Sequence, residues 1–319
     1  MKTTITRLLA AALTVTTLAI TATACGSDDD PATLTVGFVV DPSWAQIPVA
    51  EQAGYFEKHG VDVKVVNFSS GVEALQAVAA GQLDVATAAD VPTAAALTKS
   101  PSLRVVGDGS RWEGSRIIAR RSAGIAEVGD LAGKSIGTPI GTSAAYFVAN
   151  TLAHNDIEAT LVQVAPSAMV TAATQRNVDA VSIFQPYQAQ VVQALGDDAV
   201  ELRGGTYQQH SLYLASQNAL TGKSEALTAF FAALDEAGRD LRDLTEPAVA
   251  AVAAATRLQP DLLRNVLPQF DFALELTPEL AVKLDELGAW AKDQGKIDGG
   301  TALPRYDDFL DTRFLPANR

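Results

Sequence analysis

The amino-acid sequence predicts an α/β protein of two lobes, each a mainly parallel β-sheet flanked by helices. Strand-like and helix-like segments alternate over residues 34–90, and the same alternation starts again at residue 134. Strands that alternate with helices of this length pair in parallel through helical crossovers. With 319 residues, of which 48% are hydrophobic, the chain is long and apolar enough for two such units.

The first unit begins with an apolar run at 34–40, which is typical of a buried strand. Helical spacing over 43–60, ending at a glycine, predicts one helix, and the alternating segment 61–68 predicts the next strand. A helix over 72–81 and a strand over 83–90 follow. The order is therefore β-α-β-α-β.

The second unit follows two further predicted strands, at 102–109 and 115–121, and a loop with a short helix. From residue 134 onward each strand-like run is again followed by a helix-like run. The predicted strands are 134–139, 159–165 and 179–184, and the predicted helices are 143–155, 166–177 and 186–196.

The last third of the chain is mainly helical in pattern. An apolar stripe at helical spacing runs through 224–244, and Thr245 and Thr277 each begin a helix with proline in its first turn. We expect this part to return to the first unit, with the chain crossing twice between lobes. Lobe 1 then comprises 34–115 and 212–319, and lobe 2 comprises 116–211.

The amino terminus is typical of an exported lipoprotein. Residues 1–24 carry two basic residues and then an apolar run that ends in small residues, as a signal peptide does. Cys25, the chain's only cysteine, follows directly, which resembles the lipidation site of bacterial lipoproteins. Residues 25–33 then form an acidic tether, and no other segment is long and apolar enough to span a membrane.

Composition argues against several classes of function. The net charge is −13, and it becomes −15 without the signal peptide, because 22 basic residues then stand against 37 acidic ones. Such a chain is an unlikely nucleic-acid binder. The three histidines, at positions 59, 154 and 210, form no metal-ligand motif, so no metal and no cofactor are expected. The sequence also lacks a nucleophile elbow and a phosphate-binding loop, so we expect no enzyme.

Five junctions between a strand and a helix carry residues suited to binding a ligand. In open α/β sheets the ligand lies beyond the carboxyl ends of the strands, where first-turn N–H groups form an anion site. Three junctions belong to the first unit and two to the second, so facing lobes bring them to one cleft. The junctions are 41–44, 68–71, 88–93, 140–143 and 184–187.

Three segments, 50–92, 130–147 and 178–187, resemble the substrate-binding proteins of the nitrate, sulfonate and taurine class of ABC importers. The resemblance implies a two-lobed clamshell like that of type II periplasmic binding proteins, with two crossings between the lobes. It also implies an exported monomer, held by lipid at the outer face of the bacterial cytoplasmic membrane. This protein would bind a small anion and deliver it to a permease and ATPase.

The resemblance also implies the residues that contact the ligand. Their hydroxyl and backbone N–H groups can donate hydrogen bonds to sulfonate, nitrate or carboxylate oxygens, and Trp44 offers an apolar wall. The implied contacts are Ser43, Trp44, Ser69, Ser70, Asp90, Gly141, Thr142, Ser143 and Gln185. Arg111 joins them if it points inward, where it would pair with an oxyanion, and is a surface residue if it points outward.

Several alternatives remain open at this point. Many relatives carry an acid at the position of Gln185, so a neutral glutamine favours a ligand without an amine over taurine. Asp41 and Asp90 could still bind an amine. A hydroxymethylpyrimidine-type ligand, or a binding lobe that serves a sensor, fits the same residues. Hydroxymethylpyrimidine synthases share this fold, but they depend on a cysteine-rich run that this chain lacks.

Overall fold

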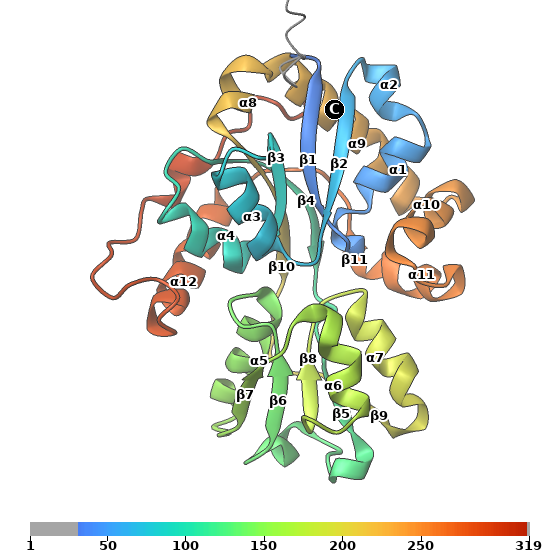
Figure 1. Ribbon diagram of the computed structural model, residues 1–319, viewed down its shortest axis with the longest axis vertical. Coiled ribbons are helices and arrows are strands. Elements are labelled where there is room, and N and C mark those ends of the chain that lie inside the picture. Colours follow the sequence, from blue (N-terminus) through green and yellow to red (C-terminus); the bar gives the residue numbers. More distant parts are fainter. Residues whose placement is uncertain (1–30, 318–319) are drawn as a thin grey trace, which may run out of the picture. The chain divides into compact units, whose positions relative to one another are not determined.

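The computed structural model describes residues 31–317, which form two β-sheets with their surrounding helices (Figure 1). The expected signal peptide, Cys25 and most of the expected tether lie outside the described residues. Within residues 31–317, no helix has the length and apolar character needed to cross a membrane.

The first sheet has six strands in the order β11-β4-β10-β3-β1-β2. Helix α3 connects β2 with β3 past β1, α4 leads from β3 toward β4 past β10, and α9 packs against α1, α2 and β1. The strands are β1 (Thr33–Val39), β2 (Asp62–Phe68), β3 (Val85–Ala89), β4 (Arg104–Trp112), β10 (Gln209–Ala215) and β11 (Phe270–Asp271). The helices are α1 (Gln46–Gln52), α2 (Tyr55–His59), α3 (Gly71–Ala79), α4 (Asp90–Leu97), α8 (Gln217–Gly222), α9 (Ser224–Arg242), α10 (Glu246–Thr256), α11 (Pro260–Val266) and α12 (Glu279–Asp293).

The second sheet has five strands in the order β7-β6-β8-β5-β9. Its helices begin where its parallel strands end, as the sequence predicts. The strands are β5 (Ile117–Arg120), β6 (Ser135–Thr138), β7 (Thr160–Gln163), β8 (Ala180–Ser182) and β9 (Ala199–Leu202). The helices are α5 (Ser143–His154), α6 (Met169–Thr174) and α7 (Tyr187–Leu195).

Both sheets are mixed, which refines the expectation of mainly parallel sheets. Strands β1, β2 and β3 pair in parallel, but β10 is antiparallel to both of its neighbours, and β11 is antiparallel to β4. In the second sheet β5 is antiparallel to β8 and β9. Four strands of each sheet still point the same way. The reversed strands β5 and β10 each adjoin a crossing, where a chain that leaves one sheet and later returns runs against its neighbours, and β11 is reversed at the sheet edge.

The expected single helix over 43–60 is wrong. This stretch forms a 3₁₀ turn at Pro42–Trp44 and then two short helices, α1 and α2. Gly54, at φ 71°, separates these helices, because the left-handed backbone conformation that glycine tolerates ends the first and starts the second. A second difference is that β3 ends at Ala89, so Asp90 is the first residue of α4 and not the last of a strand.

The chain passes between the two sheets twice. Residues 113–116 connect β4 with β5, and residues 203–208 connect β9 with β10. Because β4 and β10 are neighbours in the first sheet, the two crossings leave it side by side. The remaining chain, from α8 onward, returns to the first sheet, where β11 extends the edge at β4.

An aromatic cluster lies under the first sheet. Phe230 of α9 stacks on Phe56 with 5.6 Å between ring centroids, and it meets Phe231 and Tyr213 edge-on at 5.3 and 5.9 Å. All four rings are buried. The cluster therefore ties α2 and α9 to the central strand β10.

We expect Phe230→Ala to lower the free energy of unfolding by about 3–5 kcal/mol, because it removes a fully buried ring and leaves a cavity. Urea denaturation measures the change. Val282→Ala is the control, since Val282 is 65% exposed and its truncation should cost almost nothing. A loss below about 1 kcal/mol for Phe230→Ala would mean that the cluster is not the packing centre described here.

Candidate functional site

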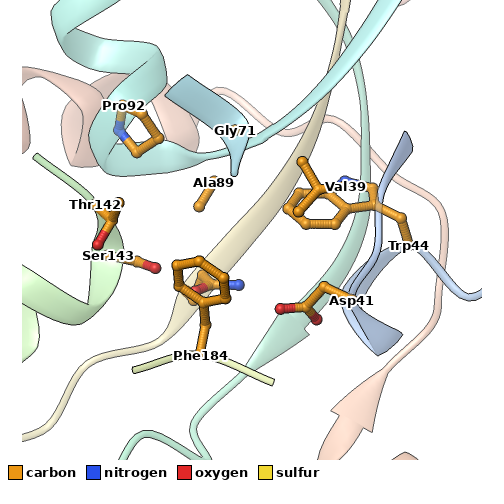
Figure 2. A pocket seen from close by; sticks show the side chains of 10 residues that line it. Val39, Asp41, Trp44, Gly71, Ala89, Pro92, Thr142, Ser143 and Phe184 are labelled. Atoms are coloured by element: carbon orange, nitrogen blue, oxygen red, sulfur yellow. The ribbon is translucent and has the colours of Figure 1, made fainter. Parts of the chain in front are cut away.

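A pocket lies between the ends of strands and the beginnings of helices from both sheets (Figure 2). The first sheet and its helices supply the wall on one side, and α5 and the end of β8 supply the other. Little space remains between them, since only about 20 Å³ is open to the centres of water-sized molecules. The lining residues are Val39, Asp41, Trp44, Gly71, Ala89, Pro92, Thr142, Ser143, Phe184 and Gln209.

Asp41 follows β1 and caps the 3₁₀ turn after it. Its side chain is 2% exposed, and one carboxylate oxygen, Oδ1, accepts hydrogen bonds from the backbone N and the Oγ of Ser43, both at 2.7 Å. The other oxygen, Oδ2, has no hydrogen-bond partner within residues 31–317. Burial raises the pKa of Asp41 to about 7, and the bonds from Ser43 only partly oppose this rise.

Ser43 and Trp44 hold this wall in place. The Ser43 hydroxyl donates to Asp41 and accepts a bond from Gln209 Nε2 at 3.3 Å, so it is already occupied. The indole of Trp44 is buried and donates to the Leu212 carbonyl at 3.3 Å. Trp44 thus lines the pocket as an apolar surface, while Ser43 orients the acid beside it.

The beginning of α5 forms the opposite side. Gly141 has φ 88°, a conformation that favours glycine, and it lets the chain turn from β6 into the helix. Thr142 is the N-cap residue, but its hydroxyl donates to the Pro139 carbonyl at 2.7 Å. The Ser143 hydroxyl has no partner among the described residues, and Figure 2 shows it turned toward the Phe184 ring. First-turn N–H groups of a helix of this length provide a partial positive charge.

The beginning of α3 comes close to the pocket through its backbone. Ser70 caps the helix by accepting the Glu73 N–H at 3.4 Å, and the Ser69 hydroxyl donates to the Glu73 carboxylate at 2.8 Å. Gly71 itself lines the pocket. A Cβ at Gly71 would lie 2.9 Å from the Ala88 Cα, so only glycine allows α3 to approach β3 this closely.

Asp90 lies behind the pocket wall, and both of its carboxylate oxygens accept hydrogen bonds. One of its oxygens accepts bonds from the Val91 N–H at 2.8 Å and from the Tyr207 hydroxyl, and the other accepts the His210 N–H at 3.2 Å. Burial raises its pKa, against the opposing effect of His210 and these bonds. Asp90 therefore joins α4 to the second crossing, and it has no free oxygen directed at a ligand.

Arg111 points away from the pocket. Its guanidinium lies 2.9 Å from Asp271, 3.2 Å from Glu275 and 3.4 Å from Asp108, and it donates to the Ala273 carbonyl at 2.7 Å. Only 7% of the side chain is exposed. Three carboxylates therefore compensate this cation, and nothing in this geometry supports the predicted contact with an oxyanion.

Gln185 also lies away from the pocket. Its Oε1 accepts the Ala189 N–H at 3.3 Å at the beginning of α7, and the residue lines a separate hollow beside Gln188. Phe184, the preceding residue, lines the pocket instead. Adjacent residues at the end of a strand point to opposite faces. The sequence therefore located this junction, but Phe184 and not Gln185 faces the pocket.

Of the residues predicted from sequence, Trp44, Thr142 and Ser143 line the pocket, and Gly141 shapes it. Asp41 and Gln209 are the polar lining residues missing from the predicted contacts. Asp41 had a readable signal, because it directly follows the first strand, whereas no motif marks Gln209. The lining holds one acidic residue and no lysine, arginine or histidine.

Comparison with known proteins places the chain in a family. The family profile described as NMT1/THI5 like matches residues 41–243, which is more than half of the chain. The chain belongs to this family. The resemblance seen in the sequence is thereby confirmed at the level of the family.

Individual relatives agree with this placement. A putative binding protein of Brucella abortus is 33% identical over 155 residues, and the match spans 47% of each chain, about half the length of that relative. A putative aliphatic sulfonates-binding protein of Escherichia coli is 25% identical over 267 residues, 81% of each chain. Both relatives are named as binding proteins.

A solved structure shows the same fold. The alkanesulfonate-binding protein SsuA from Xanthomonas axonopodis pv. citri, bound to MOPS, matches with a TM-score of 0.76 at 19% identity, over 89% of this chain and 99% of that chain. The predicted two-lobed fold of periplasmic binding proteins is therefore confirmed.

The raised pKa of Asp41 predicts a pH-dependent stability. The folded state keeps this proton up to about pH 7 whereas an unfolded aspartate loses it near 3.8, so the folded state binds more protons between these values. Stability therefore falls as the pH rises through this window, and the loss is complete above pH 7.

The native protein should lose about 2 kcal/mol in free energy of unfolding between pH 5.5 and 7.5, as Asp41 gives up its proton. Asp41→Asn should not show this loss, because asparagine has no proton to lose. Urea denaturation at both pH values, above the pI of about 4.6, measures this. The exposed Asp62→Asn variant controls for the lost negative charge. Parallel pH profiles for Asp41→Asn and the native protein would contradict the raised pKa.

Proposed function

We propose that this protein is the extracytoplasmic solute-binding component of an ABC importer, which captures a small anion-bearing solute in the pocket between the lobes. The observation that carries the proposal is the convergence of Trp44 and Gly71 from one lobe with Ser143 and Phe184 from the other on one pocket. Ligand contacts on both lobes favour the closed form. A permease and ATPase would receive the solute from that form.

The beginning of α5 is the proposed contact for the anionic group. The N–H groups of Ser143, Ala144 and Ala145 have no acceptor among the described residues, and the Ser143 hydroxyl is free as well. Short-range donors of this kind bind sulfonate or carboxylate oxygens without a full positive charge. In the same pocket, one carboxylate oxygen of Asp41 has no hydrogen-bond partner within residues 31–317, so a ligand can supply one.

The proposed ligand class is alkanesulfonate, aryl sulfonate or nitrate. The free space of about 20 Å³ is enough for about one water molecule, so each of these ligands enters only when the lobes open. Taurine, a hydroxymethylpyrimidine-type ligand and a role in sensing are the alternatives kept from the sequence. We assign no catalytic role, because the lining residues offer no nucleophile with an adjacent base and no cluster of metal ligands is present in residues 31–317.

Binding contacts are proposed for the residues that line or shape the pocket, namely Trp44, Thr142 and Ser143 with Gly141. The contacts are supported from behind by Ser43, Ser69, Ser70 and Asp90. Arg111 and Gln185 are not proposed as ligand contacts, because their side chains lie away from the pocket. The proposed lobes are 34–115 with 212–319, and 116–211. The protein is proposed to act as a monomer.

We expect Ser143→Ala to weaken anion binding about tenfold to a hundredfold, because it removes a hydroxyl donor to a charged group. A thermal-shift screen of the full chain against sulfonates, nitrate, carboxylates, taurine and hydroxymethylpyrimidine identifies the ligand first, and calorimetry then compares the variants. A ligand at a hundred times its Kd raises stability by about 2.7 kcal/mol.

Ser211→Ala is the matched control for Ser143→Ala. Both serines are buried, at 0% exposure for Ser211 and 3% for Ser143, and the Ser211 hydroxyl also has no partner among the described residues, but it does not line the pocket. Unchanged affinity in Ser143→Ala would remove the beginning of α5 from the site. A shift with the pyrimidine alone would mean that the proposed anion class is wrong.

We also propose that the chain is exported and held at the membrane by lipid on Cys25, which lies outside the described residues. In a bacterial host, Cys25→Ser should move the protein from the membrane fraction to the soluble extracytoplasmic fraction and abolish labelling by a radioactive fatty acid. Equal labelling of the variant and the native protein would exclude Cys25 as the acylated residue.

A further inference from the structure

We infer that Asp41 is a specificity-determining residue that accepts a hydrogen bond from a cationic nitrogen of the ligand. The solute then carries an ammonium group at one end and an anionic group at the other. This inference rests on the proposed function and, within it, favours amine-bearing anions such as taurine over nitrate and plain alkanesulfonates.

The first support is the free oxygen of Asp41. Both hydrogen bonds from Ser43 reach Oδ1, and Oδ2 has no partner within residues 31–317. Figure 2 shows the carboxylate turned toward the pocket, on the side of the Phe184 ring opposite Ser143. The residue as a whole is only 2% exposed, but Oδ2 is not fully enclosed, so a ligand in the pocket can reach it and gains affinity if it supplies a donor there.

The second support is the charge balance of the pocket. Its lining contains no lysine, arginine or histidine, and the buried cation Arg111 of β4 is held by three carboxylates. Above about pH 7, where Asp41 is ionised, a purely anionic ligand would enter beside a carboxylate and meet no opposing charge. A ligand with a cationic end instead compensates Asp41 while its anionic end contacts the beginning of α5.

A structural role for Asp41 does not account for this arrangement. Capping the 3₁₀ turn uses only Oδ1, and the amide oxygen of an asparagine would accept the same two bonds from Ser43. The second oxygen and the negative charge are therefore surplus to the cap. The neutral Gln185, which the sequence suggested as evidence against an amine, does not line the pocket and so does not bear on the choice.

The test compares matched pairs of probes in which a methyl group replaces the ammonium group. The pairs are taurine with 1-propanesulfonate, 3-aminopropanesulfonate with 1-butanesulfonate, and β-alanine with butyrate. Calorimetry on the full chain should show at least tenfold tighter binding of the ammonium member of one or more pairs. Asp41→Asn should reduce this preference at least tenfold and leave the methyl member bound equally well or better.

A second readout does not depend on the variant's folding. At pH 6.5 the native Asp41 is mostly protonated, so binding of the ammonium member should release up to one proton, seen as a dependence of the binding heat on the buffer. The methyl member should release none. Tyr187 faces Asp41 from α7 and stays neutral at this pH, because burial and then Asp41 raise its pKa. The pKa values of Asp90 and His210 are also raised, and the methyl member, measured on the native protein, controls for any proton that they release.

The outcomes separate the two proposals. If the methyl member binds as tightly as the ammonium member, and Asp41→Asn leaves the ratio unchanged, the inference about Asp41 is wrong while anion capture stands. If no member of any pair binds the native protein, both are wrong. Asp62→Asn, an exposed charge change at the opposite end of β2 from the pocket, should alter neither the ratio nor the proton release.

Discussion

The buried carboxylate of Asp108 is the constraint on which the junction between the lobes depends. Its side chain accepts His210 Nδ1 at 2.7 Å and the Ser211 N–H at 3.2 Å, and it faces Arg111. Its backbone exchanges two hydrogen bonds with Glu275. Burial disfavours the charged imidazole, but Asp108 outweighs this and raises the pKa of His210. One acid thus joins β4, β10 and the returning C-terminal chain where the crossings begin.

The geometry of the pocket depends on this junction. Because β4 and β10 are fixed side by side, the second crossing carries Tyr207 to Asp90 at the beginning of α4. The Tyr207 ring also meets Tyr146 of α5 at 5.0 Å. The same residue therefore contacts both walls of the pocket, and the beginning of α5 is held opposite Asp41 by packing remote from the ligand space.

Much of the fold was predictable from sequence, because strand and helix patterns are local. The two lobes, the crossings and the turn before Ser143 follow from periodicity and glycine placement. The failures have a different physical origin. Two of the three carboxylates that pair with Arg111 lie some 160 residues along the chain, and Gln185 is turned toward the Ala189 N–H of α7. Side-chain direction and long-range charge pairing do not appear in local patterns, so only the structure shows that Asp41 lines the pocket and Asp90 does not.

The three tryptophans occupy positions that make them natural fluorescent reporters. Trp44 lines the pocket, and Trp112 stacks on Phe270 at 5.4 Å just before the first crossing. Trp290 of α12 meets the edge of Tyr146 at 5.1 Å, and so connects the C-terminal helix with the helix that begins at the pocket. Ligand entry, the first crossing and the contact between α12 and α5 each have a tryptophan beside them. Variants that keep one tryptophan at a time would report occupancy and closure separately, without an added label.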